Sequence, residues 1–306
     1  MKSCRSILVL ALLGCVRVSA QEPALPQLDH ISEGKPLVSA RETQFDFTST
    51  VTGRGYRLMI AAPYQYDPAK SYPIVYILDG YWYFRPAVDF ATESGDRFQP
   101  AIVVGIGYPT DNYKEECDRR LTDLSVPPVP PNKPFGDAPP GEGDAFLRVI
   151  RDEIKPFVEK RYRVDTSRQT LYGKSLGGLM ALRQLFRNPA QFQTYIAASP
   201  SIARSSFAVL ADEGSFSQQA VAGKLHLRLL ITTADLEQPR DEPATKWNRP
   251  VDNARDLAAR LKVLDPKDVG VTYINFADEN HYSVSLASLG RGLTFALGAP
   301  PNVQAK

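Results

Sequence analysis

The chain has 306 residues, of which 43% are hydrophobic and 23% charged, a composition typical of soluble globular proteins. Its formal net charge of +2 argues against a strongly basic surface, so neither nucleic acid nor an anionic membrane is an expected partner. Only three His residues and, beyond the first twenty residues, one Cys are scattered along the sequence, so we expect no metal site.

Residues 1–20 have the pattern of an export signal. A basic start precedes an apolar run at 7–16, which is too short to span a bilayer. Small residues follow, and they predict cleavage after Ala20 and a periplasmic or secreted mature protein without a stable membrane span. Lipoprotein anchoring at Cys15 is an alternative, although Leu13 stands where a lipobox usually has a small residue.

The rest of the chain is predicted to form a leader at 21–42, one domain at 43–298 and a tail at 299–306. The domain begins with a predicted hairpin, because a glycine-containing turn joins two strand-like segments. Strands are predicted at 44–51, 56–62, 73–78, 101–106, 169–173, 194–198, 225–232 and 271–276, and helices at 144–162, 176–186, 251–264 and 283–297.

Strands and helices alternate after the hairpin. The runs PIVYIL at 73–78 and AIVVGI at 101–106 are apolar throughout, as in strands buried on both faces of a sheet. This order predicts an α/β protein with a mostly parallel central sheet, helices on both faces and an N-terminal antiparallel hairpin. Ligands of such sheets bind beyond the carboxyl ends of the strands, so functional residues should follow strands directly.

Prolines interrupt this alternation in two places. Seven of them fall within 121–143, which predicts a long loop, and we expect it to form a wall over the active site. Pro156 lies inside the helix predicted at 144–162 and is expected to kink it.

The strongest chemical motif is Gly173-Lys-Ser175-Leu-Gly177, with a predicted strand before it and a helix after it. This is the pattern of a nucleophile elbow, in which a serine occupies a tight strand-to-helix turn in an α/β-hydrolase fold. The backbone N–H of Leu176 would point at a developing oxyanion, aided by the positive end of the helix. A phosphate-binding loop is excluded, because Arg168 stands where that motif needs glycine.

A serine nucleophile needs a base, and His281 is the candidate because it lies between the last predicted strand and the last helix. His30 lies in the leader and His226 within a strand, so neither suits this role. The acid should precede His281 in the chain. Asp235 and Glu237 both follow the strand at 225–232, and either could reach the histidine.

A second oxyanion donor should come from a loop after an early strand. Gly80 follows the strand at 73–78 and permits close backbone approach, which makes the N–H of Tyr81 the candidate. Trp82 and Tyr83 come next and are candidate walls of a pocket for aryl or acyl groups.

Several further segments carry a family resemblance over about residues 40–298. They are YILDG at 76–80, VGIGYP at 104–109, the pair Arg119-Arg120 with Asp123 and Leu124, GDAFL at 143–147, the elbow, ASPS at 198–201 and ENHYSV at 279–284. Together they resemble the esterase D-like putative esterases, which include feruloyl esterases and S-formylglutathione hydrolases. Within that family the chain is most similar to siderophore esterases of the enterobactin and salmochelin type.

The resemblance implies a serine esterase that hydrolyses a small-molecule carboxylic ester through an acyl-enzyme, without a cofactor. The family commonly places Gly-x-x-Asp or Gly-x-x-Glu after the acid strand. Ala234 through Glu237 fit that pattern with Ala in place of Gly, which implies Glu237 as the acid and leaves Asp235 as the alternative. Two residues depart from the siderophore esterases: Lys174 replaces the usual elbow histidine, and Tyr81 stands where Asn is frequent.

Two alternatives remain open at this point. A siderophore trilactone hydrolase would use Arg119 and Arg120 to pair with an anionic catecholate, whereas the same arginines could instead be solvated or form structural ion pairs. A non-catalytic binding protein on the same fold is an alternative from another class.

Overall fold

The computed structural model describes residues 39–93, 97–127, 141–239, 245, 249–264 and 268–298. All of them belong to one compact unit that begins at Ser39. The predicted signal and C-terminal tail, and nearly all of the leader, lie outside the described residues, so the domain boundaries drawn from the sequence stay predictions.

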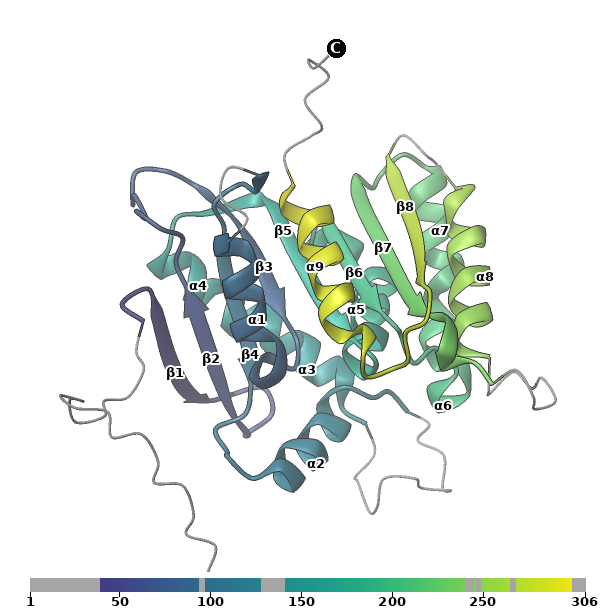
Figure 1. The fold of residues 1–306 in the computed structure, drawn as a ribbon, viewed down its shortest axis with the longest axis horizontal. Coiled ribbons are helices and arrows are strands. Elements are labelled where there is room, and N and C mark those ends of the chain that lie inside the picture. The colour runs from purple at the N-terminus through teal and green to yellow at the C-terminus, as the bar shows by residue number, and fades with distance from the viewer. Residues whose placement is uncertain are drawn as a thin grey trace, which may run out of the picture. The chain divides into compact units, whose positions relative to one another are not determined.

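The described strands form one sheet in the order β1-β2-β4-β3-β5-β6-β7-β8. β1 and β2 form the expected hairpin, β2 pairs antiparallel with β4, and every later pairing is parallel. The mostly parallel sheet and its N-terminal hairpin confirm the predicted α/β-hydrolase fold (Figure 1). The strands are β1 Glu42–Thr48, β2 Gly55–Ala61, β3 Tyr72–Ile77, β4 Ile102–Gly107, β5 Val164–Lys174, β6 Thr194–Ala198, β7 Leu227–Ala234 and β8 Val269–Phe276.

Helices cover both faces of this sheet. α1 and α9 pack side by side on one face, while α5 and α8 lie on the other (Figure 1). The described helices are α1 Gly80–Glu93, α2 Tyr113–Asp123, α3 Gly143–Val149, α4 Lys155–Arg161, α5 Leu176–Arg187, α6 Arg204–Phe207, α7 Glu213–Val221, α8 Pro250–Lys262 and α9 Val284–Leu297.

Side chains of alternate strand residues pack into two separate hydrophobic cores on opposite faces of the sheet. Tyr76 and Leu171 join the core beneath α5 and α8, whereas their neighbours Ile77 and Tyr172 join the core beneath α1 and α9. This explains the uninterrupted apolar runs, because both faces of each central strand are buried. All six residues of β3 and of β4 are buried.

The helix predicted at 144–162 is divided in the structure. α3 and α4 flank a π-helical turn at Ile150–Ile154, where the N–H of Lys155 donates to the carbonyl of Ile150. Pro156 follows at the start of α4, and its ring would clash with a carbonyl four residues back in a regular helix. The wider π turn therefore accommodates the proline that was expected to kink the helix.

α1 and α2 occupy segments where the sequence indicated no helix. Aromatic residues fill the first turn of α1 and are only moderate helix formers. α2 is highly charged, and its buried face includes Glu116 and Asp123, so it has no apolar stripe. Its start does carry a sequence signal, since the Asn112 side chain accepts a hydrogen bond from the N–H of Glu115 at 3.1 Å. The predicted loop at 121–143 accordingly begins after α2, and residues 128–140 lie outside the described part.

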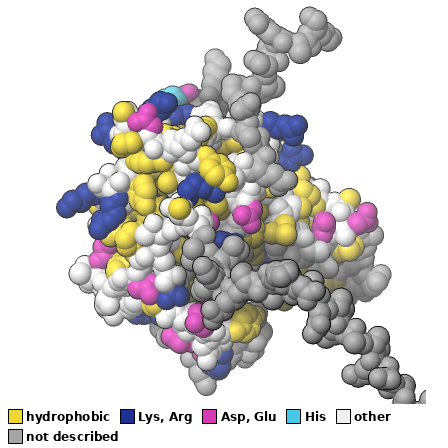
Figure 2. Space-filling view, turned by 60° about the vertical axis from the view of Figure 1, so that its left-hand side comes forward, with side chains coloured by type: hydrophobic (Ala, Val, Ile, Leu, Met, Phe, Trp, Pro, Cys, Tyr) yellow, Lys and Arg dark blue, Asp and Glu magenta, His cyan; other side chains and the backbone are white. Residues whose placement is uncertain are grey.

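The described helices include none that is both long and apolar enough to cross a membrane. On the face drawn in Figure 2, acidic and basic side chains of the described residues are interspersed among hydrophobic ones. This mixture agrees with the small net charge of the chain.

Candidate active site

Ser175 occupies the sharp turn between β5 and α5, with φ 58° and ψ −113°. Glycines on both sides of it are required by the packing of the backbone. A Cβ on Gly173 would lie 2.1 Å from the carbonyl oxygen of Gly177, and a Cβ on Gly178 would lie 2.9 Å from the carbonyl oxygen of Ala198. The segment therefore has the geometry of a nucleophile elbow, in which the serine is held at the carboxyl edge of the sheet.

Strained backbone conformations also occur along the carboxyl edge of the sheet. Asp79, Ser175, Ser199 and Asp278 all have positive φ values, of 54°, 58°, 41° and 60°. Each follows the end of a different strand, namely β3, β5, β6 and β8. Non-glycine residues in this conformation carry a cost of order 1–3 kcal/mol and cluster at functional sites. The strain therefore marks the edge where the sequence placed the site.

The predicted base and acid are in direct contact. Nδ1 of His281 lies 2.8 Å from Oε1 of Glu237. Since a carboxylate only accepts, Nδ1 carries the proton and Nε2 is left as an acceptor. The Glu237 side chain is only 3% exposed, and its other oxygen accepts the N–H of Ala234 at 3.2 Å. Burial acts to raise the pKa of Glu237, but the bond and charge of His281, together with Ser199 and the Ala234 N–H, outweigh it and hold the pKa below its ordinary value.

The serine hydroxyl does not bond to this pair in the structure. Among the described residues, Ser175 Oγ lies 3.4 Å from the hydroxyl of Ser201, whose own N–H donates to the Ser175 carbonyl. Catalytic hydrogen bonds are often long or unmade in a free enzyme and form with substrate. The ASPS segment contained Ser201, but nothing in its local pattern indicated contact with the nucleophile.

Leu176 and Tyr81 both stand at helix N-termini, as the first residue of α5 and the second of α1. Amides in a first helical turn have no acceptor within the helix, so both N–H groups are suited to an oxyanion. A Cβ on Gly80 would lie 2.6 Å from the N of Ile106, which is why the chain needs glycine before Tyr81. The Asp79 carbonyl accepts the N–H of Trp82 at 3.0 Å and so fixes the turn.

Arg120, on α2, fixes the turn at Asp79 and Gly80. Its guanidinium donates to both carboxylate oxygens of Asp79, at 2.7 and 3.0 Å, and lies 5.2 Å from the ring centre of Trp82. Arg119 donates to the carbonyl of Gly55 and stacks over Tyr108. Both arginines proposed to bind substrate thus have partners within the protein, and their contact with substrate stays a prediction.

The aromatic residues of the site divide into two groups. Tyr83 packs edge-on against Tyr172, at 6.0 Å between ring centres, and belongs with the core under α1. Trp82, Tyr113 and Tyr282 form what we term the aromatic rim. The ring centres of Trp82 and Tyr113 are 6.4 Å apart, and Tyr282 meets the His281 ring edge-on at 5.8 Å.

Two members of the aromatic rim are strongly exposed, Tyr113 by 71% and Tyr282 by 85%. They come from α2 and from the loop before α9, and their phenols are close enough to interact electrostatically. The sequence indicated Trp82 alone of the three. Rings this exposed beside the proposed base can stack on a flat substrate.

The chain is similar to several known proteins. The putative esterase family matches residues 49–265. The chain belongs to that family. The ferri-bacillibactin esterase BesA of Bacillus subtilis strain 168 is 34% identical over 80% of this chain and 85% of its own length. The siderophore triacetylfusarinine C esterase of Aspergillus fumigatus is 31% identical over 79% of this chain and 88% of its own.

Among solved structures, the BES protein from Bacillus cereus superposes with a TM-score of 0.77 and 30% identity. The match covers 88% of this chain and 100% of that protein. This chain is therefore an ester-hydrolysing enzyme, which sets aside the alternative of a non-catalytic binding protein.

Two further ionisable groups of this esterase lie beneath the site. Lys174 is only 4% exposed, and its burial lowers its pKa to about 8, although the nearby Glu237 carboxylate opposes the shift. Glu116 on α2 is also buried, and burial together with the Asp79 charge raises its pKa to about 7. The esterase thus has two buried groups, Lys174 and Glu116, whose pKa values lie near neutrality.

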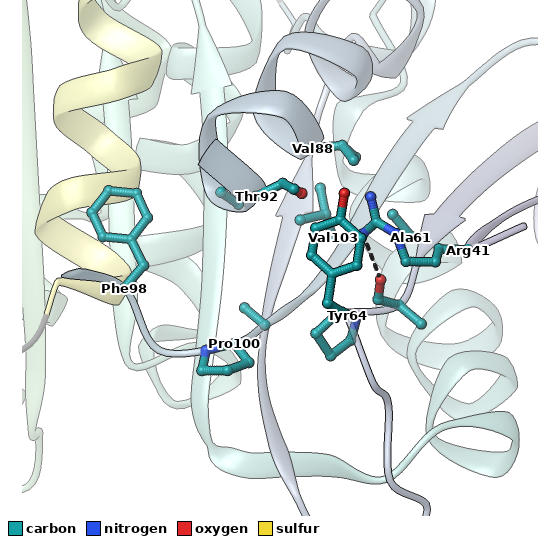
Figure 3. A pocket seen from close by; sticks show the side chains of 12 residues that line it. Arg41, Ala61, Tyr64, Val88, Thr92, Phe98, Pro100 and Val103 are labelled. Atoms are coloured by element: carbon teal, nitrogen blue, oxygen red, sulfur yellow. Dashed lines mark hydrogen bonds between the residues drawn. The ribbon is translucent and has the colours of Figure 1, made fainter. Parts of the chain in front are cut away.

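The cavity drawn in Figure 3 is separate from this site. Its volume is about 190 Å³, and Val88, Thr92, Phe98 and Val103 line it. Arg41 closes one side, where it stacks on Tyr64 and donates to the Ala62 carbonyl. This cavity adjoins the amino end of β4, opposite the catalytic edge of the parallel strands. Within the described residues, no cluster of His, Cys, Asp and Glu could hold a metal ion.

Proposed function

We propose that this chain is an exported serine esterase that hydrolyses the ester bonds of a siderophore through an acyl-enzyme on Ser175. The observation that carries the proposal is the hydrogen bond between His281 and Glu237, on the same sheet edge as a strained serine elbow. Nucleophile, acid and base then follow in the chain order of α/β-hydrolases.

In the proposed reaction, Nε2 of His281 removes the Ser175 proton while Oγ attacks the ester carbonyl. The Ser175 hydroxyl must first turn from Ser201 toward His281. The N–H groups of Leu176 and Tyr81 stabilise the oxyanion, and losing one such donor costs about 2.7–4 kcal/mol. His281 then protonates the departing alcohol, and water attacks the acyl-enzyme by the same route in reverse.

Glu237 has two roles in this scheme. It orients the imidazole so that Nε2 faces the serine, and its negative charge stabilises the imidazolium that forms. Its lowered pKa supports both roles, because the carboxylate stays ionised through the range in which His281 must be neutral.

The proposed substrate class rests on two observations. Two relatives that are more than 30% identical over most of their length are named for siderophore esters. In this chain, the aromatic rim of Trp82, Tyr113 and Tyr282 extends from α1 and α2 to the loop that carries the base. We therefore propose that aryl-bearing siderophore esters bind against these rings.

The test is a substrate panel for the purified enzyme: a catecholate trilactone, a hydroxamate siderophore ester, a feruloyl ester, an aryl acetate and an alkyl acetate. The kcat/KM for at least one siderophore ester should exceed that for the alkyl ester by about a hundredfold or more. Ser175→Ala is the control for contaminating hydrolase. Equal efficiency on alkyl and siderophore esters would contradict the assignment of substrate.

Export is tested separately, by expressing the full chain in a Gram-negative host and sequencing the mature protein. The proposal predicts a periplasmic or secreted product that begins at Gln21. Cys15→Ser is the matched control, since it would abolish processing of a lipoprotein but leave cleavage after Ala20 intact. Full-length cytoplasmic protein would refute export.

A further inference from the structure

The cavity of Figure 3 lies between elements that carry short side chains. Ala91 lies on α1, Ala61 ends β2 and Ala101 precedes β4, and none of these methyl groups is large enough to fill the space between them. Val88 and Val103, which are only 3% and 2% exposed, form the buried floor. The proposed reaction at Ser175 involves no residue of this cavity.

The volume of the cavity, about 190 Å³, limits what it can hold. An apolar cavity of about 150 Å³ is large enough to bind benzene. The present one therefore has room for a single six-membered ring with a small substituent. Its aromatic walls are Tyr64 and Phe98, which stand on different sides of it in Figure 3. Aromatic walls favour an aromatic ligand, because rings gain from stacking or edge-on contact beyond the burial of their area.

Arg41 alone carries a charge among the described residues that line the cavity. Its guanidinium lies 3.7 Å from the ring centre of Tyr64 and donates to the Ala62 carbonyl at 3.3 Å. The Arg41 carbonyl in turn accepts the N–H of Ala62 at 3.0 Å. These contacts fix the side chain beside the cavity. Since a guanidinium has five N–H donors, most of them are left for a ligand.

No carboxylate in the described part of the chain forms an ion pair with Arg41. Glu42, its neighbour in sequence, pairs instead with Arg85 of α1 at 3.2 Å. Guanidinium and carboxylate groups can form two parallel charge-assisted hydrogen bonds. A fixed guanidinium beside apolar and aromatic walls therefore matches a ligand that joins a carboxylate to an aromatic ring.

We propose that this cavity is a second binding site, which takes a monocyclic aryl carboxylate with its ring between Tyr64 and Phe98 and its carboxylate paired with Arg41. An ester hydrolase releases a carboxylic acid at every turnover, so ligands of this class form at the opposite edge of the same sheet. Binding here needs no catalytic residue, and the inference therefore stands or falls independently of the proposed function.

The experiment titrates benzoate, benzamide and hexanoate into the purified enzyme at low ionic strength and measures each Kd by saturation-transfer NMR. Benzoate should bind with a Kd of about 1 mM or lower, the range that so small a ligand reaches. Benzamide has nearly the same shape but no charge, and it should bind about tenfold more weakly. Hexanoate keeps the carboxylate but cannot stack, and it should bind about threefold more weakly than benzoate.

Arg41→Gln should weaken benzoate binding by about tenfold or more, while benzamide binding stays within about twofold of wild type. Arg161→Gln is the matched control. Arg161 also lies over a ring, 3.7 Å from the centre of Phe157, and donates to a carbonyl, but it is not among the residues that line the cavity. This control should keep the wild-type affinity for benzoate. Added salt should weaken the binding of benzoate but not of benzamide.

Three outcomes would overturn the inference. Equal affinity for benzoate and benzamide in the wild type would exclude pairing with Arg41, even if Arg41→Gln did not fold. Benzoate binding that is lost in Trp82→Ala but kept in Arg41→Gln would place the ligand at the aromatic rim instead. A dimer in sedimentation that Tyr64→Ala dissociates would assign the mouth of the cavity to a second copy of the chain.

Discussion

The side chain of Glu237 meets His281 at 2.8 Å, although the two residues follow different strands, β7 and β8. Those strands are parallel neighbours at the edge of the sheet, so their carboxyl ends bring the two loops together. The short segment Asp235–Glu237 follows β7 immediately, and it is the third of its residues that reaches the imidazole. This contact favours Glu237 over Asp235 as the acid.

Glu237→Gln should therefore lower kcat substantially, but by at least about tenfold less than loss of Ser175 or His281, because the acid acts through the histidine. Asp235→Asn should stay within about threefold of wild type. Steady-state kinetics on an aryl acetate measures both. If Asp235→Asn were the more damaging change, the acid would be Asp235 and the Glu237 contact would be structural only.

The same variant has a second readout in its pH profile. A carboxylate beside an imidazole favours the protonated form, and glutamine cannot supply that charge. The acidic limb of kcat/KM in Glu237→Gln should consequently lie at lower pH than in the wild type. A limb displaced to higher pH would show that Glu237 does not stabilise the imidazolium.

Arg120→Met should destabilise the fold, because it leaves the buried Asp79 carboxylate without its bidentate partner. Breaking a buried ion pair typically costs about 3–5 kcal/mol, and the loss is measured by urea unfolding. The double variant with Asp79→Asn should recover part of that loss, since it removes the uncompensated charge. A stable Arg120→Met enzyme with raised KM would instead identify Arg120 as a substrate ligand.

Trp82→Ala should weaken the preference for aryl over alkyl esters by about tenfold, a change that matches the loss of one stacking and apolar contact. Turnover of a minimal acetyl ester should be nearly unchanged. Tyr113→Ala should have a smaller effect in the same direction. Tyr64→Ala is the control, because Tyr64 is another exposed ring but lies beside the remote cavity of Figure 3. Unaltered selectivity in Trp82→Ala would exclude the aromatic rim from substrate binding.

The sequence was enough to select candidate catalytic residues from their places directly after strands. Ser175 lies in a motif that needs glycines because the backbone around its turn is crowded. His281 and Glu237 each follow one of the last two strands. The sheet and its hairpin were also predictable, because the apolar runs are long and turn residues separate them. These features depend on neighbours only a few residues away.

The remaining features depend on contacts between distant segments. Arg120 and Asp79 are 41 residues apart, and nothing in either segment indicated that they would pair. Ser201 approaches Ser175 only because β6 lies beside β5. The sequence did not indicate α2 because only one of its four buried residues, Leu121, is apolar. Its burial is stabilised by ion pairs such as Arg54 with Asp123.

The central claim is that Ser175 forms the acyl-enzyme, and fluorophosphonate labelling followed by peptide mapping tests it most directly. A fluorophosphonate phosphorylates an activated serine and should attach to one residue per molecule, with hydrolytic activity lost in proportion to labelling. We predict that the adduct lies on the peptide containing Ser175 and that Ser175→Ala is neither labelled nor active. An adduct on another residue, or full activity in an enzyme labelled at Ser175, would contradict it.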